Sequence, residues 1–240
     1  MIIKKPCVIE SIEKSTPNVN IYRLRIQDNT VVDFVPGMFA MLYYKDPETN
    51  EEIGRAYSIA SEPNVSYFDF MIELVHGKLT SKLENAKVGD VYYISAPYGQ
   101  FKFDPSAGKK FLFLAGGTGL APFFSMIKYA ISKKLDVDIA MIYSVRFPSW
   151  IIAKDALSEF AKSELPKISI NITITRPQPG DGWNGQTGHI DEAMIQKYVP
   201  DFAERIAYIC GPLNFVKAMK QACSNLKIPE TNIKTEMWGQ

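Results

Sequence analysis

The first half of the chain consists of short apolar runs separated by turn residues. In one run, Phe68, Phe70 and Ile72 alternate with more polar neighbours, which is the period-2 pattern of a strand with one buried face. The runs that share this character are Cys7–Glu13, Val19–Gln27, Met38–Tyr44, Arg55–Ala60, Tyr67–Val75 and Val91–Ser95. Six such strands predict an antiparallel β-barrel over residues 1–105.

The pattern changes after the segment Pro105–Lys110, where we expect a hinge. Beyond it, apolar strands alternate with helical segments. The expected strands are Phe111–Ala115, Asp138–Val145, Ile168–Thr175, Ile206–Cys210 and Asn232–Trp238, and the expected helices are Pro122–Lys133, Ile152–Ser163, Asp191–Tyr198 and Pro212–Leu226. Such alternation requires crossover connections and therefore a parallel sheet. We predict a doubly wound α/β domain over residues 106–240.

Composition and charge narrow the class of protein. The chain has 240 residues, of which 46% are hydrophobic, and a formal net charge of +1. The basic residues are scattered, which argues against nucleic-acid binding. The longest apolar run, Phe111–Phe124, is broken by glycines and falls short of the about 18 residues that a membrane span needs. We expect no membrane insertion, and the sequence does not indicate the oligomeric state.

The cysteines and histidines carry no metal or disulfide signature. Cys7, Cys210 and Cys223 are far apart and odd in number, so they form neither a disulfide framework nor the ligand set of an iron–sulfur cluster. His76 and His189 are isolated from other ligand-type residues. The N-terminal residues also lack the apolar core of a signal peptide. We expect a cytoplasmic protein without a metal site.

The tetrapeptide Arg55–Ser58 places a cation, an aromatic ring and a hydroxyl in one short strand. Arg55 and Tyr57 are two residues apart and share a face of the strand, whereas Ser58 points to the other. A guanidinium group can hold a pyrophosphate bidentately, a tyrosine ring can pack along a flavin, and a hydroxyl can reach a ring nitrogen. The alternative is an ordinary barrel strand with a surface arginine.

The segment Gly77–Glu84 follows a predicted strand. Ser81 and Glu84 match the S-x-x-E capping box, so we expect a short helix to start here. A helix start with free N–H groups and the hydroxyls of Thr80 and Ser81 suits an anion. Capping alone is the alternative.

Two turns follow strands of the second half. The glycine-rich turn Gly116–Gly119 joins an apolar strand to a helix whose first turn contains Pro122. In that context a glycine-rich turn cradles a nucleotide phosphate, and a plain tight turn is the alternative. The turn Cys210–Pro212 lies where ligands of open parallel sheets bind, outside the carboxyl ends of strands. The alternative role of Cys210 is that of a small buried hydrophobe.

Taken in order, these motifs resemble the ferredoxin–NADP reductase superfamily. The motifs are Arg-Ala-Tyr-Ser (55–58), Gly-Lys-Leu-Thr (77–80), Pro-Tyr-Gly-Gln-Phe (97–101), Gly-Gly-Thr-Gly-Leu-Ala-Pro (116–122), Cys-Gly-Pro (210–212) and the aromatic Trp238. The match covers essentially the whole chain. It implies an FAD-binding antiparallel barrel followed by a pyridine-nucleotide domain, in agreement with the hydrophobic pattern.

The resemblance also implies site residues. Those implied for FAD are Arg55, Ala56, Tyr57, Ser58, Gly77, Lys78, Leu79, Thr80, Thr118 and Trp238. Those implied for the pyridine nucleotide are Gly116, Gly117, Gly119, Cys210, Gly211 and Pro212. Ser58 would hydrogen-bond near flavin N5 and Cys210 would lie beside the nicotinamide, which makes these two the candidate catalytic residues. Trp238 would cover either the flavin ring or its adenine.

We expect the coenzyme to be NADP(H) rather than NAD(H). In nucleotide-binding folds an acidic residue near the end of the second strand accepts the ribose 2′-hydroxyl of NAD, whereas an arginine suits the 2′-phosphate of NADP. Here the second strand ends at Arg146 and the third at Arg176, with no carboxylate after Arg146 until Asp155. His189 counts against this expectation, because relatives that use NADPH often have arginine there.

These features predict a flavoprotein oxidoreductase similar to ferredoxin/flavodoxin–NAD(P)+ reductases. Hydride would pass between NAD(P)H and FAD, and single electrons would pass to or from a separate acceptor. The chain shows no iron–sulfur motif, so ferredoxin or flavodoxin is the expected partner. Two alternatives stay open: a reductase component of an oxygenase, and a non-catalytic flavoprotein electron-relay subunit of a larger complex.

Overall fold

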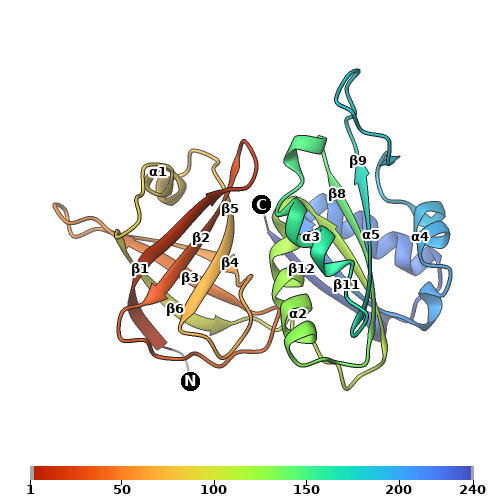
Figure 1. Ribbon diagram of the computed structural model, residues 1–240, viewed down its shortest axis with the longest axis horizontal. Helices are drawn as coiled ribbons and strands as arrows, with labels where there is room; N and C mark the ends of the chain where they lie inside the picture. Colours follow the sequence, from red (N-terminus) through yellow and green to blue (C-terminus); the bar gives the residue numbers. More distant parts are fainter. Residues whose placement is uncertain (1–2, 239–240) are drawn as a thin grey trace. The chain divides into compact units, whose positions relative to one another are not determined.

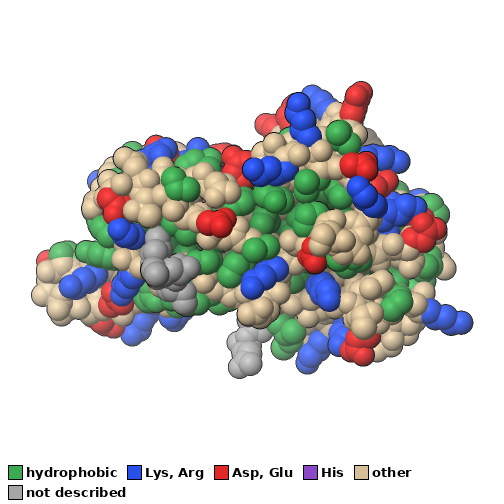
Figure 2. All heavy atoms as spheres, turned by 90° about the horizontal axis from the view of Figure 1, so that it is seen from below, with side chains coloured by type: hydrophobic (Ala, Val, Ile, Leu, Met, Phe, Trp, Pro, Cys, Tyr) green, Lys and Arg blue, Asp and Glu red, His purple; other side chains and the backbone are tan. Residues whose placement is uncertain are grey.

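The computed structural model describes residues 3–238. These residues divide into two compact units: the barrel unit comprises residues 3–103 with 121–129, and the α/β unit comprises residues 104–120 with 130–238. Helix α2 (Leu120–Ser132) contributes residues to both. Figure 1 shows the elements of each unit, and Figure 2 shows both signs of charge interspersed over the face that it presents.

The barrel unit contains a six-stranded antiparallel sheet, as predicted. Its strands are β1 (Ile3–Lys14), β2 (Val19–Ile26), β3 (Phe39–Lys45), β4 (Glu52–Ser58), β5 (Tyr67–Glu73) and β6 (Val91–Tyr98). Their order is β4-β3-β6-β1-β2-β5, which leaves β4 and β5 as the edge strands of an open barrel. Just beyond β4, the Ala60 N–H donates to the carbonyl of Asp69 on β5 at 2.8 Å, so the two edges meet there.

Strand β5 is buried on both faces, not on one as its alternation predicted. Phe68 and Phe70 lie in the barrel core. Asp69, on the opposite face, is only 4% exposed because two cations cover it. Arg23 contacts its carboxylate bidentately at 2.7 and 2.9 Å, and Lys128 of α2 approaches at 3.1 Å. Ion pairing therefore buries a polar position that periodicity assigns to solvent.

Helix α1 (Lys78–Glu84) packs against the core of the barrel unit. Leu79 and Leu83 are buried among the core side chains, and the Tyr22 hydroxyl donates to the Leu83 carbonyl at 3.0 Å. The helix begins earlier than predicted, because Gly77 is its N-cap residue and Thr80 its third helical residue. The proposed Ser81–Glu84 capping box is therefore wrong: Ser81 lies within the helix and Glu84 ends it.

The α/β unit contains a parallel sheet with helices on both faces (Figure 1), which confirms the predicted doubly wound fold. The strands are β7 (Lys110–Gly116), β8 (Asp138–Val145), β9 (Lys167–Ile174), β10 (Gln186–Thr187), β11 (Ile206–Pro212) and β12 (Ile233–Trp238), in the order β10-β9-β8-β7-β11-β12. The α-helices after α2 are α3 (Lys154–Phe160), α4 (Glu192–Tyr198) and α5 (Leu213–Asn225). The short 3₁₀ segments are Gly117–Gly119, Pro148–Trp150, Phe202–Glu204 and Glu230–Asn232.

Two elements differ from the sequence prediction. Helix α3 is shorter than predicted because Ala153 has a left-handed φ of 49°, and the preceding Ile151 and Ile152 are buried. Strand β10 was not predicted, and it pairs with β9 after a loop rich in proline and glycine. In that loop the Trp183 indole N–H donates to the Gln186 carbonyl at 2.8 Å.

Arg205 joins the amino ends of the central strands. Its guanidinium donates to the Phe111 carbonyl at 3.1 Å and to the Asp138 carbonyl at 3.2 Å. It also pairs with the carboxylates of Asp138 at 2.8 Å and Asp201 at 2.8 and 3.1 Å. Hydrogen bonds from Arg205 lower the pKa of Asp201 to about 2. The Arg205 side chain is 6% exposed. It is a buried cation that is paired with two carboxylates and two main-chain carbonyl groups.

Candidate cofactor-binding sites

Strand β4 presents Arg55 and Tyr57 at the edge of the barrel sheet. Arg55 is exposed and Tyr57 is half-buried against the core, with its ring centroid 6.2 Å from that of Phe70. Burial raises the pKa of the Tyr57 hydroxyl to about 12, and the positive charge of Arg55 opposes the rise. That electrostatic effect agrees with both side chains lying on one face. Ala56 is exposed and Ser58 is half-exposed.

The six arginines separate into two groups. Arg23, Arg25 and Arg205 each make a bidentate contact with a carboxylate. Within residues 3–238, Arg55, Arg146 and Arg176 form no ion pair, and all three are exposed. An exposed guanidinium without a carboxylate partner keeps its donors available for a phosphate group. The sequence analysis predicted a phosphate contact at each of these three positions.

At the start of α1, the hydrogen-bonding groups are largely paired with one another. The Gly77 N–H donates to Thr80 Oγ1 at 2.8 Å, and this hydroxyl approaches the Gly77 carbonyl at 3.2 Å. Leu79 points into the core. Lys78 is exposed, with Nζ 3.8 Å from Glu51 Oε1. Lys78 therefore reaches a ligand here only by leaving its exposed, loosely held partner Glu51.

The glycines at the end of β7 and in the turn after it are needed for different structural reasons. Gly117 has φ +56° and open space around it, as a turn that admits a ligand requires. A Cβ on Gly119 would lie 2.2 Å from the Cys210 carbonyl oxygen, so the two turns touch through their backbones. A Cβ on Gly116 would lie 2.9 Å from the ring of Phe215. The intervening Thr118 is half-exposed.

Cys210 is buried at the carboxyl end of β11, and Gly211 and Pro212 complete the strand. Burial raises the pKa of the Cys210 thiol well above its usual value, and the charge of Glu236 raises it further. Glu236 occupies the position of β12 paired with Cys210. Burial also raises the pKa of the Glu236 carboxyl. The sequence analysis missed Glu236, because its importance comes from its register with Cys210 and from its burial.

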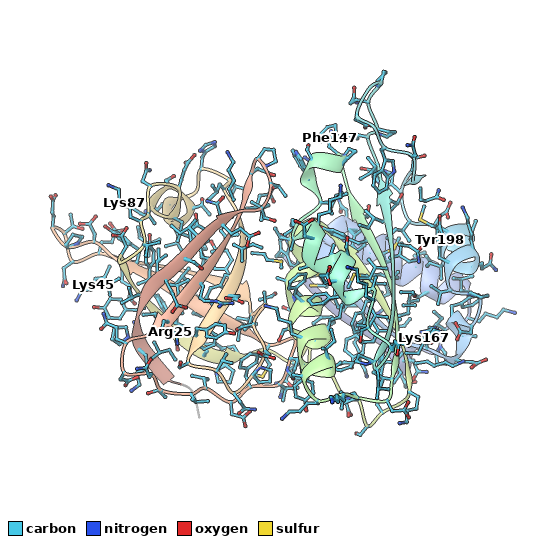
Figure 3. All side chains as sticks on the ribbon, viewed as in Figure 1. Arg25, Lys45, Lys87, Phe147, Lys167 and Tyr198 are labelled. Atoms are coloured by element: carbon cyan, nitrogen blue, oxygen red, sulfur yellow. The ribbon has the colours of Figure 1, made fainter. Side chains whose placement is uncertain are left out.

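The second and third strands of the α/β unit bring Arg146 and Arg176 together. The Arg176 N–H donates to the Arg146 carbonyl at 2.9 Å. The Arg146 guanidinium carbon lies 5.5 Å from the centre of the Trp150 ring, and Trp150 packs edge-on against Phe147 at 5.3 Å. In Figure 3, Phe147 lies beyond the end of β8, at the edge of the sheet opposite Lys167. Two exposed arginines without carboxylate partners therefore lie at the carboxyl ends of the neighbouring strands β8 and β9.

Trp238 ends β12, where it is paired in register with Pro212 and half-exposed. Within residues 3–238, the candidate residues thus form two groups. One lies on β4 and α1 of the barrel unit, and the other lies at the carboxyl ends of the strands of the α/β unit.

Comparison with known proteins identifies the family. The family described as "Oxidoreductase FAD-binding domain" matches residues 6–103, and the family described as "Oxidoreductase NAD-binding domain" matches residues 113–221. A solved ferredoxin NADP+ reductase from Neisseria gonorrhoeae has the same fold, with a TM-score of 0.79 at 19% identity over 98% of each chain. The chain therefore contains an FAD-binding domain followed by an NAD-binding domain, both of the kind found in oxidoreductases. Its fold is that of the ferredoxin NADP+ reductase.

The proteins that the chain resembles in sequence are diverse. It is 31% identical over 210 residues to a glycine betaine monooxygenase reductase subunit of Chromohalobacter salexigens, covering 86% of this chain and 56% of that protein. It is 28% identical over 233 residues to NADH-cytochrome b5 reductase 1 of Coccidioides immitis, covering 93% of this chain and 75% of that protein. The chain thus spans about half the length of the monooxygenase reductase subunits it matches. No helix within residues 3–238 is long and apolar enough to cross a membrane.

Proposed function

We propose that this chain binds FAD and transfers electrons from NAD(P)H to a separate redox protein. The observation that carries the proposal is the set of three exposed arginines without carboxylate partners, Arg55, Arg146 and Arg176. Each lies where a phosphate group of one of the two nucleotides is expected. The FAD- and NAD-binding domain families that match the chain support the same assignment.

The barrel residues fit the FAD side. Arg55 and Lys78 supply cations for the pyrophosphate, and Tyr57 supplies a half-buried ring for the flavin to pack on. Ser58 offers a hydroxyl at the end of the same strand. When bound, FAD supplies the two-electron and one-electron redox chemistry. The protein contributes position and electrostatics, because none of these side chains is itself redox-active.

The carboxyl ends of β7 and β11 fit the pyridine-nucleotide side. Gly117 opens the turn after β7, and Gly119 allows this turn to lie against the Cys210 carbonyl. Because its pKa is raised by burial, the Cys210 thiol stays protonated and therefore uncharged at neutral pH. Glu236 places a carboxyl group beside it. These residues would orient the nicotinamide.

For the coenzyme we propose a preference for NADPH over NADH. Arg146 and Arg176 share one edge of the sheet, and neither is neutralised by a carboxylate. A dianionic 2′-phosphate would use their free donors, whereas the 2′-hydroxyl of NADH would not.

The acceptor we propose is a small redox protein, ferredoxin or flavodoxin. A second candidate is the oxygenase component of a two-component oxygenase, and the 31% identity to a monooxygenase reductase subunit favours it. We also propose a cytoplasmic location, because all three cysteines are free and buried, as in proteins of reducing compartments.

Reconstitution of the purified chain with FAD tests the proposal. We expect bound FAD in the absorption spectrum, bleaching by NADPH without oxygen, and steady ferricyanide reduction. Replacing ferricyanide by ferredoxin, flavodoxin or an oxygenase component then ranks the acceptors. A chain that binds no FAD, or whose flavin neither coenzyme reduces, would contradict the proposal. A flavin that is reduced but passes no electrons to any acceptor would indicate a relay subunit instead.

A further inference from the structure

The ring of Phe215 fills the space beside two glycines that lie far apart in the sequence. A Cβ on Gly116 would lie 2.9 Å from Phe215 Cγ, and a Cβ on Gly211 would lie 2.7 Å from Phe215 Cδ1. The same Cβ of Gly211 would also lie 3.3 Å from Gly116 Cα. One ring therefore packs over both the end of β7 and the end of β11, two neighbouring strands.

Backbone conformation does not explain why these two positions are glycine. Gly116 has φ −124° and ψ 119°, an extended conformation that any residue adopts. Gly211 lies within strand β11 and is not among the glycines with positive φ. Because separations under 3 Å are closer than real Cβ contacts, the ring is what excludes a side chain at both positions. The glycines are required by Phe215.

The position of Phe215 connects it with ligand binding. It lies in the first turn of α5, which begins directly after Pro212. Part of the ring packs against the core of the α/β unit, and the side chain as a whole is half-exposed. Ligands of open parallel sheets bind at this edge, outside the carboxyl ends of the strands. A flat ring fixed by the core is a rigid support on which the backbones of the two turns pack.

We propose that Phe215 is a positioning residue for the ribose–pyrophosphate segment that NADH and NADPH share. The inference rests on the proposed function. The ring packs on Gly116 and Gly211 and so fixes the Gly116–Gly119 turn and the Cys210–Pro212 turn, whose main-chain groups then meet the dinucleotide in one geometry. The effect of Phe215 is therefore the same for both coenzymes, whereas Arg146 discriminates between them.

The first experiment compares Phe215→Leu with Phe202→Leu in the FAD-loaded protein. Phe202 is a matched control, because it is also half-buried against this core cluster but precedes β11 at the opposite end of the strand. We expect Phe215→Leu to raise KM for NADH and NADPH by about tenfold each, with kcat changed less than twofold. Phe202→Leu should lower Tm comparably and leave both KM values unchanged.

The second experiment is a double-mutant cycle. Gly211→Ala pushes a methyl group into the ring and should raise KM, and combining it with Phe215→Leu should relieve the clash. We expect the double variant to have a lower KM than the product of the single effects predicts, a coupling that independent sites do not show. Additive effects would contradict the packing of the Phe215 ring on Gly211.

The outcomes separate this inference from the proposed function. If Phe215→Leu and Phe202→Leu lower Tm alike and neither changes KM, Phe215 is purely structural and the inference is overturned. If the wild-type protein shows no turnover with either coenzyme, the proposed function fails. Calorimetric binding of NAD+ and NADP+ to the same variants then tests Phe215 directly, with equal affinities in wild type and Phe215→Leu overturning the inference.

Discussion

Cys210 and Glu236 occupy paired positions on β11 and β12, and the pKa of the Cys210 thiol is raised by burial and further by the Glu236 carboxylate. Burial raises the pKa of Glu236 itself. An acid whose pKa is raised by folding holds its proton more tightly in the native state. The free energy of unfolding therefore falls as the pH rises from the unfolded pKa of Glu236 through its higher folded pKa.

We expect Glu236→Gln to remove this pH dependence. Urea unfolding of wild type and variant across pH 4 to 7 measures it, with Glu230→Gln as a control because Glu230 is an exposed carboxylate. The variant should gain stability relative to wild type as the pH rises through this window. If the difference between the two proteins stays constant with pH, the carboxyl of Glu236 is not desolvated as described.

Removal of the buried cation at Arg205 should destabilise the α/β unit strongly. Arg205→Met removes the buried partner of Asp138 and Asp201, which keep only the exposed Lys167 and Lys110, and breaking a buried ion pair costs about 3–5 kcal/mol. Lys220→Met is the control, since its pair with Glu230 is exposed and such pairs contribute about 0–1 kcal/mol. Chemical denaturation measures both. Similar losses for the two variants would contradict the role of Arg205.

The same cluster predicts an acid transition. Hydrogen bonds from Arg205 lower the pKa of Asp201 to about 2, so its ionised form stabilises the native state above the unfolded pKa of about 4. This contribution, about 2 kcal/mol, should be lost as the pH falls from 4 towards 2. Asp201→Asn should lack that part of the acid titration, and an identical acid profile in wild type would refute the assignment.

Arg55 should contribute to FAD affinity. Arg55→Ala removes a charge-assisted contact worth ~1.5–3 kcal/mol and should weaken FAD binding about ten- to hundredfold. Arg25→Ala is the matched control, an arginine of the same unit that is already paired with Glu10. Flavin titration of the apoprotein measures both affinities. Equal FAD retention by Arg55→Ala and wild type would show that this arginine does not contact the pyrophosphate.

Arg146 should select the coenzyme. We expect Arg146→Ala to lower kcat/KM for NADPH about tenfold and to change the value for NADH less than twofold, because only NADPH carries the 2′-phosphate. Stopped-flow reduction of the flavin with each coenzyme measures the ratio. A wild-type preference for NADH, or an NADPH preference that survives the substitution, would overturn the proposal.

The sequence predicted the order of the strands along the chain better than the contacts between them. The motifs identified the β4 residues and both turns of the α/β unit, since glycine, proline and charge act locally. The sequence did not predict which residues far apart in the chain contact each other. The contact of Lys128 with Asp69 buries a polar position on β5, and the Phe215 ring packs on two glycines that the family resemblance assigned to a ligand.

Glu236 was missed for the same reason. Its significance comes from register with Cys210 and from burial, and neither is a property of the residues around it in the sequence. The late start of α3 has a local cause in the left-handed Ala153, but nothing in the alanine itself indicates that conformation.

The Arg205 cluster and the glycine turns lie at opposite edges of one sheet, separated along β7 by the run from Phe111 to Gly116, or roughly 16 Å of strand. Thermal robustness and coenzyme choice can therefore be engineered as separate traits. A variant library at the amino edge can be screened for heat tolerance without altering coenzyme use. A library of variants at the carboxyl ends of the strands can be screened for coenzyme use while the Arg205 cluster, which is left unchanged, keeps the protein folded.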